Sequence, residues 1–307
     1  MSAYRAARPA IWAERLLERP IVSPGMDARM GHNINGPSLI RVPSWVQQPL
    51  GRYYLYFAHH HGLYIRLAYA DHLLGPWTVY APGVLPLADS GFHDHLASPD
   101  AHVDTQRLKI TLYYHGVVRG GQKQMTRVAQ SPDGRNFVAT GAELLDSYAR
   151  VFKHGDWVYA ITMPGTLSRS RTGLNHFERG PALLSPATRH CAVRVAGNTL
   201  QVFYSNRGDN PESILCSEVV LSGDWLSWRA GPPALILSPE KAYEGSGLPQ
   251  VPSIAGWASQ PVRQLRDPCI FCEDGETYLV YCVAGESGLA LARIHGTSKL
   301  PKPDQAG

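Results

Sequence analysis

The sequence predicts an all-β fold, a five-bladed β-propeller whose ring is closed by an N-terminal strand. Glycine (29) and proline (24) are abundant among the 307 residues. This composition suits many short strands joined by tight turns and argues against a helical bundle. Tyrosine (15) and tryptophan (7) are also frequent, and aromatic residues are enriched in strands. One pattern of strands recurs five times, and radial repetition of four-stranded sheets is the natural architecture for such a repeat.

The second strand is the clearest element of each repeat, because it is rich in β-branched and aromatic residues and bounded by turn formers. The second strands begin at Tyr53, Ile110, Trp157, Leu200 and Tyr278. Third strands are expected over residues 64–70, 125–130, 166–171, 214–220 and 288–294, and fourth strands near Trp77, Phe137, Phe177 and Trp228. A two-sheet sandwich could use the same strands, but sandwiches lack so regular a four-strand cycle.

The fifth repeat lacks a fourth strand at its C-terminal end. Residues 19–24 (Arg-Pro-Ile-Val-Ser-Pro) are unused near the N-terminus, so they are expected to complete the last blade and close the ring. The predicted organisation is therefore an N-terminal extension over residues 1–18, a single propeller over residues 19–295 and a flexible tail over residues 296–307.

The charge balance and the composition argue against several classes of binding partner and cellular location. Lys and Arg (29) exceed Asp and Glu (25) by 4, but the basic residues are scattered singly, which argues against a nucleic-acid partner. No apolar run of about 18 residues predicts a membrane span, and no uninterrupted apolar core predicts a signal peptide. The odd number of cysteines, five, suits reduced thiols in a cytoplasm. Cys269 and Cys272 have the spacing of half a zinc site, but no second pair follows, so both are expected in the core.

Residues whose side chains could bind a ligand or take part in catalysis lie on one predicted face of the ring. In a propeller blade, the loop that enters the first strand and the loop between the second and third strands lie on the same face. Binding chemistry concentrates on such loops, so this face is expected to carry the ligand funnel. Eight of the 13 histidines fall there: His32, His59, His60, His61, His93, His95, His115 and His190. The candidate substrate-binding residues are Asn35, His59, His60, His115, Arg150, Arg207 and Arg266.

Several short motifs resemble those of the five-bladed propeller glycoside hydrolases, the arabinanase/xylosidase and fructosidase-like superfamily. Arg266-Asp267-Pro268 is similar to their strand-opening Asp-Pro. Ser98-Pro99-Asp100-Ala101, followed by Leu112-Tyr113-Tyr114, resembles their second-blade motif. Ser131-Pro132-Asp133-Gly134 and Tyr69-Ala70-Asp71, the latter followed by Gly75-Pro76-Trp77, resemble their outer-strand phrases. The resemblance covers residues 19–295 and implies a divergent member of that superfamily.

The resemblance also implies catalytic residues. In that superfamily a carboxylate base, a carboxylate that tunes pKa and a carboxylic acid surround an axial funnel, as glycoside hydrolysis requires. It implies Asp267 as the base, Asp100 as the tuning carboxylate and Glu244, followed by Gly245, as the acid. The first-blade slot that normally holds the base reads Asn35-Gly36-Pro37-Ser38, and residues 146–150 at the third-blade opening contain no Glu. Either the site is rearranged or the scaffold carries other chemistry.

The favoured hypothesis is therefore a hydrolase, a glycosidase that acts on a glycoside or polyol without a required cofactor. One alternative is a metal-dependent hydrolase or lyase in which His32, His59 and His115, with His93 or His95, bind a divalent ion. Another is a non-catalytic carbohydrate-binding propeller. The sequence contains no phosphate-binding loop, dinucleotide fingerprint or nucleophile-elbow motif, and it leaves the substrate and the oligomeric state open.

Overall fold

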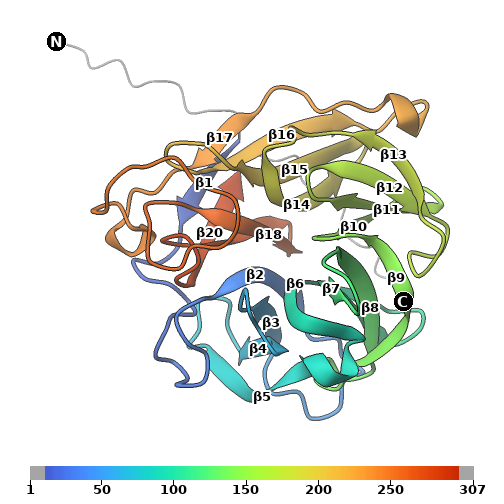
Figure 1. The fold of residues 1–307 in the computed structure, drawn as a ribbon, viewed down its shortest axis with the longest axis horizontal. Helices are drawn as coiled ribbons and strands as arrows, with labels where there is room; N and C mark the ends of the chain where they lie inside the picture. The colour runs from blue at the N-terminus through green and yellow to red at the C-terminus, as the bar shows by residue number, and fades with distance from the viewer. Residues whose placement is uncertain (1–10, 297–307) are drawn as a thin grey trace.

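The computed structural model describes residues 11–296 and is a ring of five four-stranded antiparallel sheets (Figure 1). The five-bladed propeller prediction is confirmed. Blade 1 contains β2 (Asn35–Arg41), β3 (Tyr53–Ala58), β4 (Tyr64–Ala70) and β5 (Thr78–Pro86). Blade 2 contains β6 (Phe92–Asp104), β7 (Lys109–Val118), β8 (Gln124–Ser131) and β9 (Val138–Asp146). Blade 3 contains β10 (Arg150–His154), β11 (Trp157–Thr162), β12 (Thr166–Ser170) and β13 (Glu178–Ala182).

The remaining two blades complete the ring. Blade 4 contains β14 (Thr188–Ala196), β15 (Thr199–Asn206), β16 (Ile214–Val220) and β17 (Ala234–Leu237). Blade 5 contains β18 (Arg266–Glu273), β19 (Glu276–Cys282), β20 (Leu289–His295) and β1 (Trp12–Arg15). The helices within residues 11–296 are three single 3-10 turns, η1 (Leu87–Asp89), η2 (Trp225–Ser227) and η3 (Ala242–Glu244). None of them is long and apolar enough to cross a membrane.

The outer strand of blade 4 begins later than the aromatic pattern predicts. The predicted start near Trp228 is wrong, since β17 begins at Ala234. Trp228 instead follows the 3-10 turn η2, is buried, and donates from its indole nitrogen to the carbonyl of Ser222 at 3.0 Å. Its ring anchors the connection between β16 and β17 rather than opening a strand.

The strand that completes blade 5 is also displaced from its predicted position. β1 pairs with β20, Trp12 opposite His295 and Arg15 opposite Ala292, so the outer strand lies within the segment expected as an N-terminal extension. Residues 19–24 do not form it. They contain two prolines, which cannot donate to a ladder. Their pairing with the blade is limited to Leu289, through a bridge with Val22 and backbone hydrogen bonds from Ile21 and Val22. Of the predicted tail, only Gly296 falls within the described residues.

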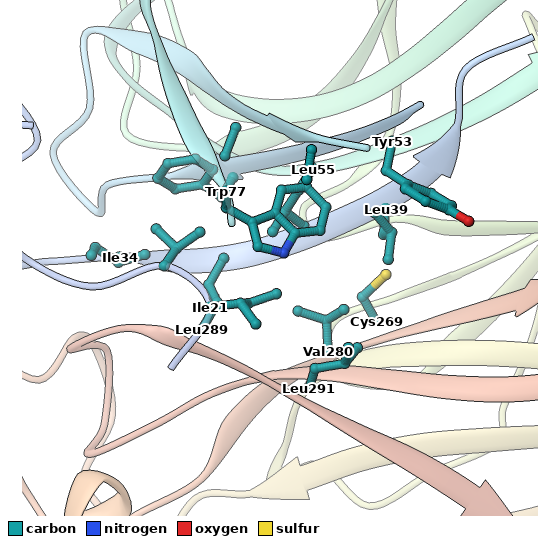
Figure 2. Packing of buried hydrophobic residues seen from close by; sticks show 14 of the residues in the cluster. Ile21, Ile34, Leu39, Tyr53, Leu55, Trp77, Cys269, Val280, Leu289 and Leu291 are labelled. Atoms are coloured by element: carbon teal, nitrogen blue, oxygen red, sulfur yellow. The ribbon is translucent and has the colours of Figure 1, made fainter. Parts of the chain in front are cut away.

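The hydrophobic core is divided among the blade interfaces. The structure contains five clusters of buried apolar side chains, and each draws on two neighbouring blades. Figure 2 shows the cluster between blades 5 and 1, where Leu39 and Leu55 face Cys269 and Val280. Since burial of apolar surface is the dominant favourable term in folding, the interfaces hold the five sheets at fixed positions around the axis. This fixed arrangement sets the positions of the inner strands that surround the site.

Candidate axial site

The inner strands of four blades share a β-bulge where they meet the predicted functional face. In each, two residues lie opposite one residue of the neighbouring strand. The bulged pairs are Gly36-Pro37, Ser98-Pro99, Arg189-His190 and Asp267-Pro268. A bulge re-aims side chains and is common beside functional sites. Ser98 (φ 45°) and Asp267 (φ 47°) have left-handed backbones, which are uncommon for residues other than glycine. In blade 3, Tyr148 (φ 62°) takes a similar conformation just before β10.

These positions surround a cavity of about 210 Å³ at the axial end of the inner strands. Polar and ionisable side chains from all five blades line it. The lining residues are Asn35, His60, Ala97, Ser98, Gln124, Tyr148, Met163, Arg189, His190, Arg207, Gly256, Asp267 and Glu286. Ligand pockets usually measure about 300–1,000 Å³, so this cavity suits a small molecule or a single unit of a larger one.

Asp267 and His190 form the closest ion pair of the cavity wall. Asp267 is 4% exposed, and its Oδ1 lies 2.7 Å from His190 Nδ1. The other carboxylate oxygen accepts from the backbone N–H of Gly36 at 3.3 Å. Burial alone raises the pKa of Asp267, but His190, Arg266 and Arg189 outweigh it and hold that pKa below its ordinary value. Asp267 is therefore an ionised partner that orients the imidazole of His190.

Gly36 explains why the first blade has no carboxylate at its opening. A Cβ atom at residue 36 would lie 2.8 Å from Ser98 Cα, a contact too short for real side chains. The residue also has φ 57°, which favours glycine. The blade-1 bulge therefore packs directly against the blade-2 bulge, and no side chain can project there without moving Ser98.

Replacing Gly36 with alanine is expected to destabilise the fold by about 1–3 kcal/mol, because it adds a steric clash to an unfavourable φ. Urea unfolding measures the effect. Gly197→Ala is the matched control, since Gly197 has φ 58° and open space around its Cβ position. A cost at Gly36 no greater than that at Gly197 would show that the close packing against Ser98 is absent.

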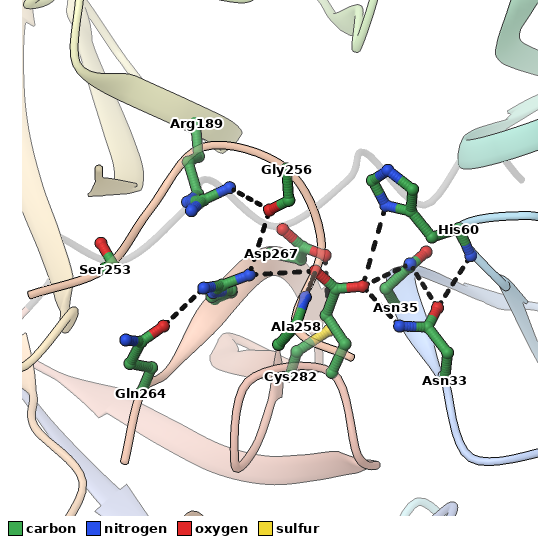
Figure 3. A network of polar contacts seen from close by, with 12 residues as sticks. Asn33, Asn35, His60, Arg189, Ser253, Gly256, Ala258, Gln264, Asp267 and Cys282 are labelled. Atoms are coloured by element: carbon green, nitrogen blue, oxygen red, sulfur yellow. Dashed lines mark hydrogen bonds and ion pairs between the residues drawn. The ribbon is translucent and has the colours of Figure 1, made fainter. Parts of the chain in front are cut away.

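A second polar network, which includes Asn33, Asn35 and Ala258 (Figure 3), surrounds Glu286 on the same wall. Its Oε1 accepts from Arg266 Nη1 at 3.0 Å, and its Oε2 accepts from the amides of Asn33 (2.6 Å) and Asn35 (3.1 Å). Both carboxylate oxygens therefore have donors, so Glu286 is suited to positioning rather than proton transfer. It also accepts from the N–H of Ala258 at 3.3 Å and so holds the segment between η3 and β18 at the cavity rim.

A buried carboxylate behind the wall fixes two arginines. Glu212 is fully buried and lies 2.9 Å from Arg189 Nε and 3.1 Å from Arg266 Nε. Ser205 also donates to it at 2.6 Å. Burial raises the pKa of Glu212 even with both guanidinium groups present. The arginines are thereby held at fixed positions beside Asp267, which supports the ion pair with His190.

The structure brings only part of the predicted site together. Asp267, Asn35, His60 and Arg207 line the cavity. Arg266 lies behind the cavity wall, where it forms ion pairs with Glu286 and Glu212. The residues predicted for the site that do not line the cavity are Asp100, Glu244, Arg150, His32, His59 and His115.

Asp100 was predicted as the tuning carboxylate and Arg150 as a substrate-binding residue, but their contacts place both away from the cavity. Asp100 accepts from the N–H of Val151 at 2.8 Å and pairs with His102 at 2.8 Å, away from the cavity lining. Burial raises its pKa, but His102 and Arg150 outweigh burial and lower that pKa overall. Arg150 donates to the carbonyls of Pro99 (2.7 Å) and Cys191 (3.0 Å). Both residues tie neighbouring blades together rather than face a ligand.

Glu244, the predicted acid, also lies away from the cavity. Glu244 is fully buried beneath the outer edge of blade 5, where it accepts from Arg15 and Tyr281, each at 2.8 Å. Gly245, which suggested the acid motif, has φ 81° and ends the 3-10 turn η3. The Glu-Gly dipeptide therefore marks the end of a turn and an ion pair with the N-terminal strand.

The histidines proposed as metal ligands are not assembled as such. His32 is exposed, whereas His115 is fully buried and packs against Tyr148 with ring centroids 3.9 Å apart and ring planes at 47°. His59 Nδ1 accepts from the N–H of His61 at 2.8 Å. Within residues 11–296, no group of three or more His, Cys, Asp or Glu side chains is arranged to hold a metal ion. The metal-dependent alternative therefore has no ligand set in the described part of the chain.

His60 provides a pH-dependent test of the cavity wall. Burial, with His95, His61 and His190 nearby, lowers the pKa of His60 from 6.5 to about 3. The unfolded chain therefore takes up this proton at a higher pH than the folded chain, and stability is lost as the pH falls from about 6.5 towards 3. His60→Gln is expected to flatten the decline between pH 6.5 and 4.5, measured by urea unfolding. His61→Gln is the control, because His61 is exposed. Equal pH profiles of stability for both variants would contradict the burial of His60.

Nine of the 13 residues that line the cavity were not among the candidate site residues predicted from the sequence, and four of these nine bear on the chemistry. Ser98 and His190 lie in the bulges of β6 and β14, whereas Tyr148 and Glu286 lie in loops. Neither the type nor the spacing of these four residues indicated that they meet. One signal could have found Ser98. Gly36, Ser98 and Asp267 each precede a proline at the opening of an inner strand, and their alignment would have placed all three at equivalent positions. His190 has no such proline, so only the assembled ring reveals its contact with Asp267.

A ring of five four-stranded sheets with a polar axial cavity defines a five-bladed β-propeller. A thermostable family-43 glycoside hydrolase superimposes with a TM-score of 0.59 and 14% identity, covering 88% of this chain and 95% of that one. A GH43 β-xylosidase/α-arabinofuranosidase from a compost microbial metagenome, solved with xylotriose, superimposes with a TM-score of 0.60 and 13% identity. The match covers 95% of this chain and 96% of that one. At such low identities these likenesses show the shared fold.

The chain is 37% identical over 297 residues to the uncharacterized protein R118 of Acanthamoeba polyphaga mimivirus, covering 85% of this chain and 83% of that protein. It therefore belongs to the same family as R118. No protein-family model matches the chain.

Proposed function

We propose that the chain hydrolyses a small glycoside or comparable sugar-like molecule in the axial cavity, with His190 and Asp267 as the proton-transfer pair. The observation that carries the proposal is the 2.7 Å contact between these two side chains on the cavity wall. Family-43 neighbours that share the fold include an enzyme solved with xylotriose, which supports a sugar-like ligand.

The roles follow from the contacts. His190 Nδ1 faces Asp267, so Nε2 is the nitrogen left to exchange a proton with water or with the leaving oxygen. Asp267 fixes the orientation of the ring and stabilises the imidazolium that forms. Glu286, Arg189 and Arg207 line the same cavity and offer polar contacts to hydroxyl groups. The cavity volume of about 210 Å³ favours one sugar unit.

The test is a screen of 4-nitrophenyl monoglycosides and short oligosaccharides, with and without a chelator, on the full chain and on His190→Asn. Turnover is expected to be insensitive to the chelator and about 10²–10⁴-fold lower in the variant, the usual contribution of a general acid or base. Monosaccharide binding without turnover would favour the carbohydrate-binding alternative, and turnover that His190→Asn leaves unchanged would overturn the proposed pair.

A further inference from the structure

Arg207 is a cation on the cavity wall that has no carboxylate partner. It follows β15 in a loop of the functional face, lines the cavity and is half-buried. The other arginine of the cavity lining, Arg189, lies 2.9 Å from Glu212. Within residues 11–296, by contrast, no ion pair joins Arg207 to an Asp or Glu side chain. Its charge is therefore available to a ligand in the cavity.

Two backbone carbonyls fix one side of the Arg207 guanidinium group. Nε donates to the carbonyl of Ala187 at 3.3 Å, and Nη2 donates to the carbonyl of Pro186. The guanidinium group is planar and carries five N–H donors in a fixed arrangement. With Nε and one N–H of Nη2 in use, the end formed by Nη1 and the other N–H of Nη2 still offers two parallel donors. The carbonyls hold the group in place but do not neutralise its charge.

The carboxylates around the cavity already have cations beside them. Glu212 and Glu286 contact arginines, and Asp267 contacts His190. Acid catalysis of glycoside hydrolysis requires His190 to carry the proton that it donates. In that state four cations (His190 and three arginines) face three carboxylates, and Arg207 is the cation without a partner. A small anion in the cavity would balance its charge.

We propose that the sugar unit bound in the axial cavity is a uronic acid, and that Arg207 binds its carboxylate. The inference rests on the proposed glycoside hydrolysis and names the class of sugar. Two parallel N–H donors match the two oxygens of a carboxylate, a pairing for which arginine is better suited than lysine. Because the cavity of about 210 Å³ favours one sugar unit, the carboxylate and the glycosidic bond belong to the same ring.

A carboxylate suits this wall better than a phosphate does. One arginine without a partner balances one negative charge, whereas a phosphate monoester carries about 1.5–2 charges near pH 7. The additional charge would face the carboxylates of Asp267 and Glu286, which line the same cavity. A sugar phosphate is therefore the appropriate second anion for the test.

Titration calorimetry with free monosaccharides tests the inference on the full chain without any turnover. D-glucuronic and D-galacturonic acids are compared with D-glucose, D-galactose and glucose 6-phosphate. One uronic acid is expected to bind at least about 10-fold more tightly than its neutral counterpart, as for a hydrogen bond to a charged group. Added salt should weaken the binding of the acid more than that of the neutral sugar. Equal affinities for acid and neutral sugar, or tighter binding of glucose 6-phosphate, would overturn the inference.

Variants of Arg207 separate recognition of the carboxylate from a structural role. Arg207→Gln is expected to lower the affinity for the uronic acid by about 10–100-fold and to bring the ratio of acid to neutral affinity close to one. Arg207→Lys, which keeps the charge without the paired donors, should retain part of the preference. Both variants lose contacts with Pro186 and Ala187, so a merely structural role would lower both affinities equally, leave their ratio unchanged and overturn the inference.

Arg119→Gln is the matched control. Arg119 is an exposed arginine in the loop between β7 and β8 on the same face, but it does not line the cavity. The ratio of acid to neutral affinity should stay as in the unmodified chain. A loss of preference as large as in Arg207→Gln would show a general effect of surface charge and would overturn the specific role of Arg207.

The inference and the proposed function fail in different ways. Among 4-nitrophenyl glycosides, uronides should be hydrolysed with a higher kcat/KM than the matching neutral glycosides. Uronic acid binding that depends on Arg207, without hydrolysis of any glycoside, would support the inference and overturn the hydrolysis. Hydrolysis of neutral glycosides with no preference for uronides, left unchanged in Arg207→Gln, would support the hydrolysis and overturn the uronic acid.

Discussion

Replacing Asp267 with asparagine is expected to lower the turnover of any substrate of the axial cavity by about 10²–10⁴-fold without unfolding the chain. The carboxylate contacts His190 Nδ1 at 2.7 Å. Asparagine keeps the shape but removes the charge that stabilises a protonated imidazole, and its amide group can present an N–H where an acceptor is needed. Steady-state kinetics, with thermal unfolding of both proteins, measure the effect.

The control for this experiment is Asp100→Asn, an identical change near the blade-2 bulge. Asp100 contacts Val151 and His102 and does not line the cavity, so turnover per folded molecule should stay within a few-fold of the unmodified chain. Activity that a chelator abolishes but Asp267→Asn leaves intact would move the mechanism to a metal site. Full activity in Asp267→Asn would remove Asp267 from the chemistry.

The fold was predictable because its signal is local. Runs of aromatic and β-branched residues between turn formers define strands, and the third strand predicted over residues 64–70 coincides with β4 (Tyr64–Ala70). The closing strand was less visible. β1 (Trp12–Arg15) is short and contains two charged residues, and its place depends on contacts with residues more than 220 positions away, such as Glu244 and Glu240.

The site was predictable only where one residue carried its own signal. Asp267 stands before a proline at the opening of an inner strand, and that placement indicated its position at the axis. His190 gains its chemical meaning from its contact with Asp267, which joins blade 4 to blade 5. Glu244 shows the opposite error, because a carboxylate followed by glycine resembles a catalytic motif when the glycine ends a 3-10 turn.

The buried carboxylate of Glu244 is expected to contribute a large share of the free energy that holds β1 in blade 5. Glu244 accepts from Arg15 Nε and Nη2 at 2.8 Å each, from Tyr281 Oη at 2.8 Å, and from two backbone N–H groups, those of Glu240 (2.8 Å) and Lys241 (2.9 Å). Burial raises its pKa, but Arg15 and these N–H groups outweigh burial and lower that pKa overall. Five donors therefore converge on one ionised group that links β1 to the rest of blade 5.

Glu244→Gln is accordingly expected to destabilise the fold by about 3 kcal/mol, because it leaves the Arg15 charge without its buried partner. Urea unfolding measures the loss, and hydrogen exchange should quicken first at the amides that pair β1 with β20. Glu240→Gln is the matched control, since Glu240 pairs with the same arginine at 3.1 Å but its side chain is 64% exposed, and exposed pairs contribute about 0–1 kcal/mol. Below its unfolding temperature, Glu244→Gln should keep normal turnover, because Glu244 does not line the axial cavity. A stable variant with turnover reduced 100-fold would instead return Glu244 to a catalytic role.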